Sequence, residues 1–284
     1  MKNNKYLITG INGYMASYLV KYIKETDKNS KIYGIIRKES DLRPDLEPFI
    51  EEIFYYDKDL LKYTDKDKRE IDFSNFNAVF HLATNFKSDD SLKTIQTLIE
   101  DNLLATISLY KQIENSNKQP HLIVTSSWSA YKCNEIFSPN NVYSATKYYA
   151  EDSSKIFNLH KITFLRISDT YGKYDTRPKI HNLLTRQDNP ITNLNSPKNQ
   201  KINMTHIEDV CRALLYSYKN KFYGKADLYY KENEISLDEL VKLLKLKDIK
   251  FGNKEVIDLP NQVNILKDFK LKHNINNIYK DLKG

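Results

Sequence analysis

Residues 6–23 read "YLITGINGYMASYLVKYI" and carry the clearest structural signal in the sequence. A short apolar strand pattern ends at Thr9, and an amphipathic helix pattern begins a few residues later. Gly10 and Gly13 lie between them, where glycine lets the chain turn tightly and approach a pyrophosphate at the positive end of the helix. Ala16 is small enough for close helix–strand packing. The order strand, turn, helix is what this motif requires, so we interpret the stretch as a phosphate cradle, with a purely structural turn as the alternative.

Short apolar runs continue to alternate with amphipathic ones downstream. Helix patterns occupy residues 14–25, 94–114 and 143–158. Strands alternating with helices predict an α/β protein, a Rossmann-type doubly wound parallel sheet with right-handed crossovers and helices on both faces. The runs rich in β-branched and aromatic residues, which we expect to be buried strands, are residues 5–9, 31–36, 53–56, 78–83, 121–126 and 162–167.

The pattern changes after Tyr174. The segment 186–203 is polar with two prolines and is expected to be a loop, and helices are expected over residues 206–220 and 236–247. Ser236 and Glu239 have the spacing of a capping box. We therefore expect a dinucleotide-binding domain over residues 1–174 and a smaller mixed C-terminal substrate lobe over residues 175–284, with some chain crossing back to the sheet.

Composition excludes several classes of protein. The 284 residues are 40% hydrophobic and 29% charged, which is typical of a globular chain. The net charge of +7 comes from lysines interspersed with acids, without the basic stripe that a nucleic-acid partner needs. No apolar run could span a membrane. Cys133 and Cys211 are isolated, without metal-ligand spacing, so we expect a reduced, cytoplasmic protein. A basic balance suits phosphorylated small molecules.

The sequence "GIIRKES" ends the second expected strand. NAD-binding folds usually place an acidic residue there for the ribose hydroxyls, whereas Arg37 and Lys38 occupy this place. A guanidinium can pair with a 2′-phosphate, so NADP(H) is favoured and NAD(H) is the alternative. The alternative is that Arg37 and Lys38 are ordinary solvated surface residues in a lysine-rich chain.

Candidate reactive groups follow the fifth expected strand. Ser126 and Ser127 lie at its carboxyl end, where open α/β sheets bind ligands. Tyr143 and Lys147 are four residues apart on the next helix, so their side chains share one face. A phenol needs a nearby cation to exchange protons near neutral pH.

Taken together, the chain resembles the extended short-chain dehydrogenases/reductases of the NAD-dependent epimerase/dehydratase type. The resemblance runs nearly end to end through motifs in the expected order. These are "TGINGYMA", "DKDL" (57–60), "FHLAT" (80–84), "SSWSAY" (126–131), "YSATK" (143–147) with Glu151, "LRISDTYG" (165–172) and "HIEDV" (206–210).

The resemblance implies roles for individual residues. Tyr143 would be the general acid/base, Lys147 would favour its phenolate and bond the nicotinamide ribose, and Ser127 would bond the reacting oxygen. Ser127 is chosen over Ser126 because the family serine lies four residues before the motif tyrosine, Tyr131. The implied cofactor-binding residues are Thr9, Gly10, Asn12, Gly13, Tyr14, Met15, Arg37, Lys38, Asp59, Leu60, Leu82, Ala83, Thr84, Tyr143 and Lys147, and the implied substrate-binding residues are Thr84, Ser127, Trp128, Ser129 and Asp169.

The resemblance also implies a reaction class on a nucleotide-linked sugar. Family dehydratases carry acids just after the active-site serine, where this chain has Trp128 and Ser129, so dehydration is disfavoured. The expected NADP favours a reductase of a nucleoside-diphosphate keto-deoxy sugar, in which Tyr143 protonates the oxygen. The alternatives are a nucleotide-sugar epimerase and a redox-inert NADP-binding sensor.

Two positions depart from the family pattern. Asp169 replaces an Asn that often contacts substrate phosphates, and an ionised Asp would repel them. Ile202 replaces an Arg that clamps the diphosphate, for which Arg177, Lys179, Lys198 or Lys201 could substitute.

Other expectations concern histidines, a thiol and assembly. We expect His81 to be satisfied by backbone in its strand and His206 to open a helix, and we consider Cys133 a buried thiol rather than a catalytic one. By family analogy, the helices around 95–113 and 143–158 would pair in a homodimer. Leu98, Leu104 and Leu109 fit such a face, as they would fit the core of one chain.

Overall fold

The computed structural model describes residues 3–87, 89, 91–131, 136–188 and 190–283, and its main feature is one large sheet. The eight strands have the order β11-β7-β6-β5-β1-β2-β3-β4. All neighbours in it pair in parallel except β3 and β4. This is the predicted doubly wound sheet. Its strands are β1 Lys5–Thr9, β2 Lys31–Arg37, β3 Ile50–Asp57, β4 Lys62–Thr64, β5 Ala78–His81, β6 His121–Ser127, β7 Ile162–Ile167 and β11 Gly224–Leu228.

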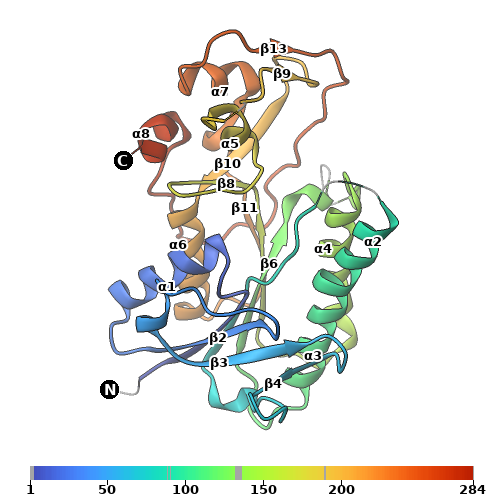
Figure 1. Ribbon diagram of the computed structural model, residues 1–284, viewed down its shortest axis with the longest axis vertical. Helices are drawn as coiled ribbons and strands as arrows, with labels where there is room; N and C mark the ends of the chain where they lie inside the picture. Colours follow the sequence, from blue (N-terminus) through green and yellow to red (C-terminus); the bar gives the residue numbers. More distant parts are fainter. Residues whose placement is uncertain (1–2, 88, 90, 132–135, 189, 284) are drawn as a thin grey trace.

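Helices cover both faces of this sheet (Figure 1). On one face, α1 (Tyr14–Thr26) packs against α6 (Ile207–Lys219) over a core that includes Leu19 and Leu214. On the other face lie α2 (Leu92–Leu98), α3 (Ala105–Glu114) and α4 (Val142–Ser153), over a second core that includes Leu109 and Tyr110. Both faces of the central strands are therefore buried, as a parallel sheet requires. Short 3-10 turns occur at Glu47–Phe49, Phe73–Asn75, Trp128–Ala130, Ser154–Ile156, Lys231–Asn233 and Ile275–Asn277.

The predicted helix over 94–114 is helical throughout, but its middle is not an α-helix. A π-helical turn, η3 (Ile99–Leu104), separates α2 from α3. The turn places Asp101 and Asn102 inward, where both are buried. Wider turns of this kind are frequent at functional sites because they redirect side chains that an α-helix would point elsewhere.

The C-terminal lobe packs around a smaller core of its own at the top of Figure 1. The predicted capping box is confirmed, because Ser236 and Glu239 exchange hydrogen bonds at the start of α7. The segment 186–203 is not wholly loop, since β9 pairs with β13 and β10 begins at Lys201. The elements of the lobe are β8 Asp169–Tyr171, β9 Asn193–Leu194, β10 Lys201–His206, β12 Glu234–Ser236, β13 Lys250–Phe251, α5 Ile180–Thr185, α7 Leu237–Leu243 and α8 Ile278–Lys283.

Chain from the second half also returns to the large sheet. α6 covers one face, and β11 forms the edge strand beside β7. The boundary at residue 174 stays a prediction. Within the described ranges, no helix has the length and apolar character needed to cross a bilayer.

Candidate active site

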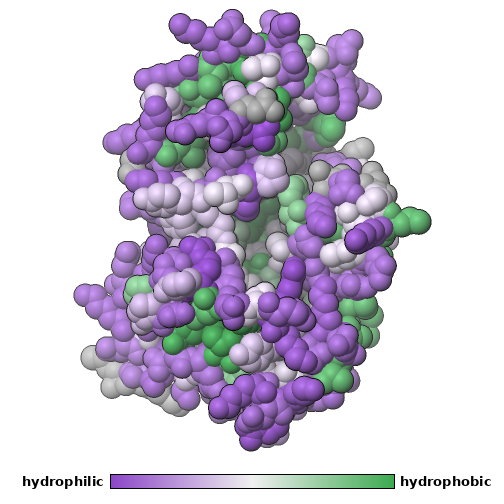
Figure 2. Space-filling view, viewed as in Figure 1, coloured by the Kyte–Doolittle hydropathy of each residue, from purple (hydrophilic) through white to green (hydrophobic). Residues whose placement is uncertain are grey.

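A cavity of about 820 Å³ lies between the carboxyl edge of the large sheet and the C-terminal lobe. Figure 2 shows the surface hollowed between the upper and lower halves of the molecule. The size is that of a site for a cofactor or a small-molecule ligand. Most of the sequence-predicted residues line it, namely Thr9, Gly10, Asn12, Gly13, Tyr14, Met15, Arg37, Leu82, Ala83, Thr84, Ser127, Trp128, Ser129, Tyr143, Lys147 and Asp169.

Three predicted cofactor-binding residues are not among the lining residues. Lys38 instead forms an ion pair with Asp57, with 3.6 Å between Nζ and Oδ2. Asp59 and Leu60 form a turn whose backbone N–H groups donate to Asp57 Oδ1. Their hydrogen bonds to that carboxylate lower the pKa of Asp57, together with the charge of Lys38. The turn therefore holds the Asp57 carboxylate in place, a role for Asp59 and Leu60 that the sequence did not indicate.

The glycine turn has the geometry of a cradle. Gly10 has φ +66°, and a Cβ there would lie 2.8 Å from the Ala83 Cα atom. The Gly13 N–H donates to the Gly10 carbonyl at 2.8 Å and α1 begins at the next residue. The close approach that needs glycine at residue 10 is thus to the chain after β5, while the helix N-terminus faces the cavity. A dinucleotide phosphate fits this turn.

The Asn12 side chain, which lines the cavity, also holds the glycine turn in place. Its side chain donates to the Asp41 carbonyl at 2.8 Å and accepts from the Arg43 N–H at 3.0 Å. These bonds tie the glycine turn to the segment after β2.

The place expected to select NADP is occupied by a charge network. Arg37 Nη2 lies 3.1 Å from Asp101 Oδ2, and Lys58 Nζ lies 2.5 Å from Asp101 Oδ1. Asn85 also donates to Asp101 Oδ2 at 2.9 Å. Burial alone would raise the pKa of Asp101, but the bonds from Lys58 and Asn85 and the charge of Arg37 lower it below its ordinary value.

Tyr143 and Lys147 project from the first turns of α4. Asn141 caps this helix by accepting from the Ser144 N–H at 2.9 Å. Lys147 is 4% exposed, and burial lowers its pKa to about 8, although the charge of Glu151 acts in the opposite sense. Tyr143 is partly exposed to the cavity, and desolvation raises the pKa of its phenol to about 12.

The groups that oppose this rise are the Thr84 hydrogen bond and the Arg177 charge, while Asp169 adds to it. The expected help from Lys147 therefore stays a prediction. Phe86 packs edge-on against the Tyr143 ring at 4.9 Å between centroids, a neighbour that the sequence did not indicate.

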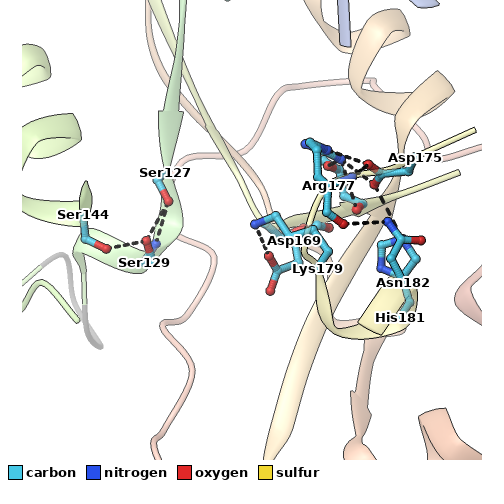
Figure 3. Close-up of polar contacts among 11 residues, drawn as sticks. Ser127, Ser129, Ser144, Asp169, Asp175, Arg177, Lys179, His181 and Asn182 are labelled. Atoms are coloured by element: carbon cyan, nitrogen blue, oxygen red, sulfur yellow. Dashed lines mark hydrogen bonds and ion pairs between the residues drawn. The ribbon is translucent and has the colours of Figure 1, made fainter. Parts of the chain in front are cut away.

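A chain of hydroxyl groups runs from the end of β6 to α4 (Figure 3). Ser127 Oγ lies 2.7 Å from Ser129 Oγ, which lies 2.8 Å from Ser144 Oγ. Ser126 instead bonds Glu151 at 3.1 Å, inside the protein. Both serines line the cavity and both are linked to α4, Ser126 through the buried Glu151 carboxylate and Ser127 through the hydroxyls of Ser129 and Ser144.

The lobe contributes charged groups to the opposite wall (Figure 3). Lys179 Nζ lies 2.8 Å from Asp169 Oδ1 and 4.2 Å from the centroid of the Phe86 ring. Arg177 makes two bonds to Asp175 at 2.8 Å, and its guanidinium lies over the Tyr14 ring. Burial would raise the pKa of Asp175, but Arg177 and His181 lower it strongly. Asp175 had no signal in the sequence.

The two histidines singled out in the sequence, His81 and His206, both lie within the described residues. His81 is buried but bonds the hydroxyls of Thr9 and Thr106 at 2.8 and 2.9 Å rather than backbone, so the prediction of backbone partners is wrong. Thr9 ends β1 directly beside His81, and Thr106 lies in the first turn of α3, so the two hydroxyls reach the ring from different elements. Burial lowers the pKa of His81 to about 3. His206 opens α6 as predicted. Cys133 lies outside the described residues.

This arrangement is a Rossmann-type fold with a glycine cradle and candidate proton-transfer groups in one cavity. The family model for the NAD dependent epimerase/dehydratase family matches residues 6–229. The chain belongs to that family.

Similar proteins carry related activities in their names. UDP-glucuronate 4-epimerase 1 of Arabidopsis thaliana is 28% identical over 159 residues, which are 50% of this chain and only 37% of that protein. Solved structures include MoeE5 in complex with UDP-glucose and NAD, with 20% identity, 98% and 97% coverage of the two chains and a TM-score of 0.75. The UDP-N-acetylglucosamine 4-epimerase from Bacillus cereus has 20% identity, the same coverage and a TM-score of 0.73. At these identities the structural likeness shows the fold.

Proposed function

We propose that the protein is a nicotinamide-dinucleotide-dependent epimerase of a nucleoside-diphosphate sugar. The observation that carries this proposal is the pairing of Tyr143 and Lys147 on one face of α4, in the same cavity as the glycine cradle. The named activities of similar proteins support epimerisation rather than the reductase that the sequence favoured. Trp128 and Ser129 follow Ser127 without a carboxyl group, which argues against dehydration.

Net reduction was expected because Arg37 and Lys38 favoured NADP. Because Arg37 is held by Asp101, the residue expected to bind a 2′-phosphate has a carboxylate partner already. MoeE5 binds NAD, and NAD is the cofactor that we propose here. An epimerase needs no net reductant, since the cofactor returns to its starting state in each turnover.

The residues of this chain supply the proton transfer. Tyr143 takes the proton of a sugar hydroxyl as that carbon is oxidised, and returns it to the same oxygen after the other face of the keto sugar is presented. The bound dinucleotide supplies reversible transfer of two electrons and one hydrogen. Ser127 bonds the reacting oxygen, and Lys147 carries the positive charge that favours the phenolate.

The sugar diphosphate would face the wall made by the lobe. Asp169 does not present an isolated negative charge there, because Lys179 pairs with it at 2.8 Å. Arg177 and Lys201 also line the cavity and are bound to Asp175 and Glu234. Lys198 is not among the lining residues. We propose that Lys201, next to Ile202, replaces the diphosphate-clamping Arg of the family pattern, and that Lys179 offsets the charge of Asp169.

A homodimer and a cytoplasmic location remain part of the proposal. The structure separates the three leucines that suggested an interface. Leu98 and Leu109 are fully buried within the chain, whereas Leu104 is 36% exposed. On the same side of the sheet, Leu92, Tyr149 and Ile156 are also exposed and would be the residues available to a partner.

The test is incubation of the protein and NAD with UDP-glucose, UDP-glucuronate and UDP-N-acetylglucosamine, followed by separation of the sugar epimers. The proposal predicts one epimer pair that interconverts without net formation of NADH. Stoichiometric NADPH oxidation with a nucleotide-linked keto sugar would instead establish the reductase. Dinucleotide binding without turnover of either kind would favour the redox-inert sensor.

A further inference from the structure

The Arg37–Asp101 ion pair lies in the wall of the cavity, at the carboxyl end of β2. Both residues line the cavity, although they are 64 positions apart in the sequence. Arg37 comes from the carboxyl end of β2, and Asp101 comes from the π-helical turn η3. The Asp101 side chain is 7% exposed, whereas that of Arg37 is 54% exposed. The carboxylate is therefore the fixed member of the pair, and the guanidinium rests on it.

Asp101 is held from three directions. Lys58 bonds Oδ1, while Arg37 and Asn85 both bond Oδ2. A carboxylate has about four lone-pair sites, so one acceptor site on Oδ1 is left after these three bonds. A ribose hydroxyl could donate to that site and form a charge-assisted hydrogen bond.

The surrounding charges balance. Arg37 and Lys58 both pair with Asp101, and Lys38 pairs with Asp57. A third carboxylate, that of Glu100, lies 4.0 Å from Lys58. Three cations thus face three carboxylates. A 2′-phosphate bound to Arg37 would lie beside the fixed carboxylate of Asp101, which would repel it.

Tyr56 adds a second polar group at this place. Its hydroxyl is buried, it lines the cavity, and no partner for it exists among the described residues. Such an orphaned hydroxyl is costly unless a ligand bonds it. A nucleoside entering beside Asp101 would provide that partner.

We propose that Asp101 is the residue that sets cofactor choice: it supplies the ribose acceptor that β2 lacks and restrains Arg37, so that NAD is bound in preference to NADP. This inference rests on the dinucleotide part of the proposed function. It reverses the expectation from "GIIRKES", in which Arg37 acts as a free 2′-phosphate ligand.

Calorimetric titration of the purified protein with NAD and with NADP tests the proposal without any need for turnover. Asp101→Asn removes the negative charge that pairs with Arg37 and would repel a 2′-phosphate, so the ratio of NADP affinity to NAD affinity is expected to rise at least about tenfold. Glu100→Gln is the matched control, because it removes the same charge from the same helical turn but does not contact Arg37. Its ratio is expected to stay within about threefold of the wild type.

A second variant keeps the test decisive if Asp101→Asn does not fold. Arg37→Met alters a half-exposed side chain, and a restrained Arg37 predicts that this variant leaves NADP affinity within about threefold of the wild type. Combined with Asp101→Asn, it should abolish the gain in NADP affinity. A tenfold loss of NADP binding in Arg37→Met alone would overturn the proposal. Failure of the wild type to bind either dinucleotide would overturn the proposed function itself.

Discussion

Lys179 neutralises Asp169 across a distance of 2.8 Å on the lobe side of the cavity, opposite the helix that carries Tyr143. The side chains are 18% and 30% exposed, so water screens the pair only in part. The salt bridge explains how a chain with Asp at this position could still accept an anionic substrate. Lys179 also contacts the Phe86 ring, and Phe86 contacts Tyr143. Phe86 therefore links the Lys179–Asp169 pair on the lobe side to Tyr143 on the other side of the cavity.

Lys179→Met should weaken the binding of UDP about tenfold, because it leaves Asp169 unpaired beside the diphosphate. The double variant Asp169→Asn with Lys179→Met should recover most of this loss, since the repelling charge is gone. Titration of UDP into the three proteins measures both effects. Equal weakening in the single and double variants would contradict charge compensation and show that Lys179 contacts the ligand directly.

Lys147 gives the protein a stability that depends on pH. Burial lowers its pKa in the folded protein from 10.5 to about 8. Between these values the unfolded chain binds more protons than the folded one, so the free energy of unfolding rises with pH across this window. Relative to Lys147→Met, the wild type should gain about 3 kcal/mol between pH 8 and 10.5.

Urea unfolding of both proteins across this range measures the Lys147 effect. The comparison with Lys147→Met removes the contribution of the tyrosines, which ionise in the same range. A difference between the two proteins that does not change with pH would show that Lys147 keeps its ordinary pKa.

Gly10→Ala should disrupt the phosphate cradle. The new Cβ would lie 2.8 Å from Ala83 Cα at φ +66°, so backbone must move at the point where the cradle meets the chain after β5. We expect at least about tenfold weaker NAD binding. Gly224→Ala is the control, because Gly224 also has positive φ but a Cβ there meets nothing within 4 Å. Both variants should lose stability, and equal loss of NAD affinity in both would contradict the assignment.

Local patterns predicted the sheet well. Strands β1 and β7 begin and end at the predicted residues, because their apolar runs are bounded by polar or glycine residues. The capping box at Ser236 also follows from spacing alone. The π-helical turn did not, since nothing in the period of residues 94–114 marks a wider turn.

Charge pairing explains what the sequence could not show. Arg37 and Lys38 were interpreted from their position after a strand, yet their roles depend on Asp101 and Asp57, which only the folded chain brings near. The same holds for Asp169 and Lys179, where the sequence suggested repulsion and the structure supplies the opposite charge. Residue type and position therefore predicted which residues line the cavity. The charge that each of them presents depends on its ion-pair partner in the folded chain.

The most direct test of the account is the rate of nucleotide-sugar epimerisation in Tyr143→Phe, beside Tyr149→Phe as a control on the same helix. Tyr149 is 50% exposed and is not among the residues that line the cavity. If Tyr143 is the acid/base, its variant should keep NAD binding and lose about 10²- to 10⁴-fold in turnover, while the control stays close to the wild type. Near-normal turnover in Tyr143→Phe, with folding intact, would contradict the central claim.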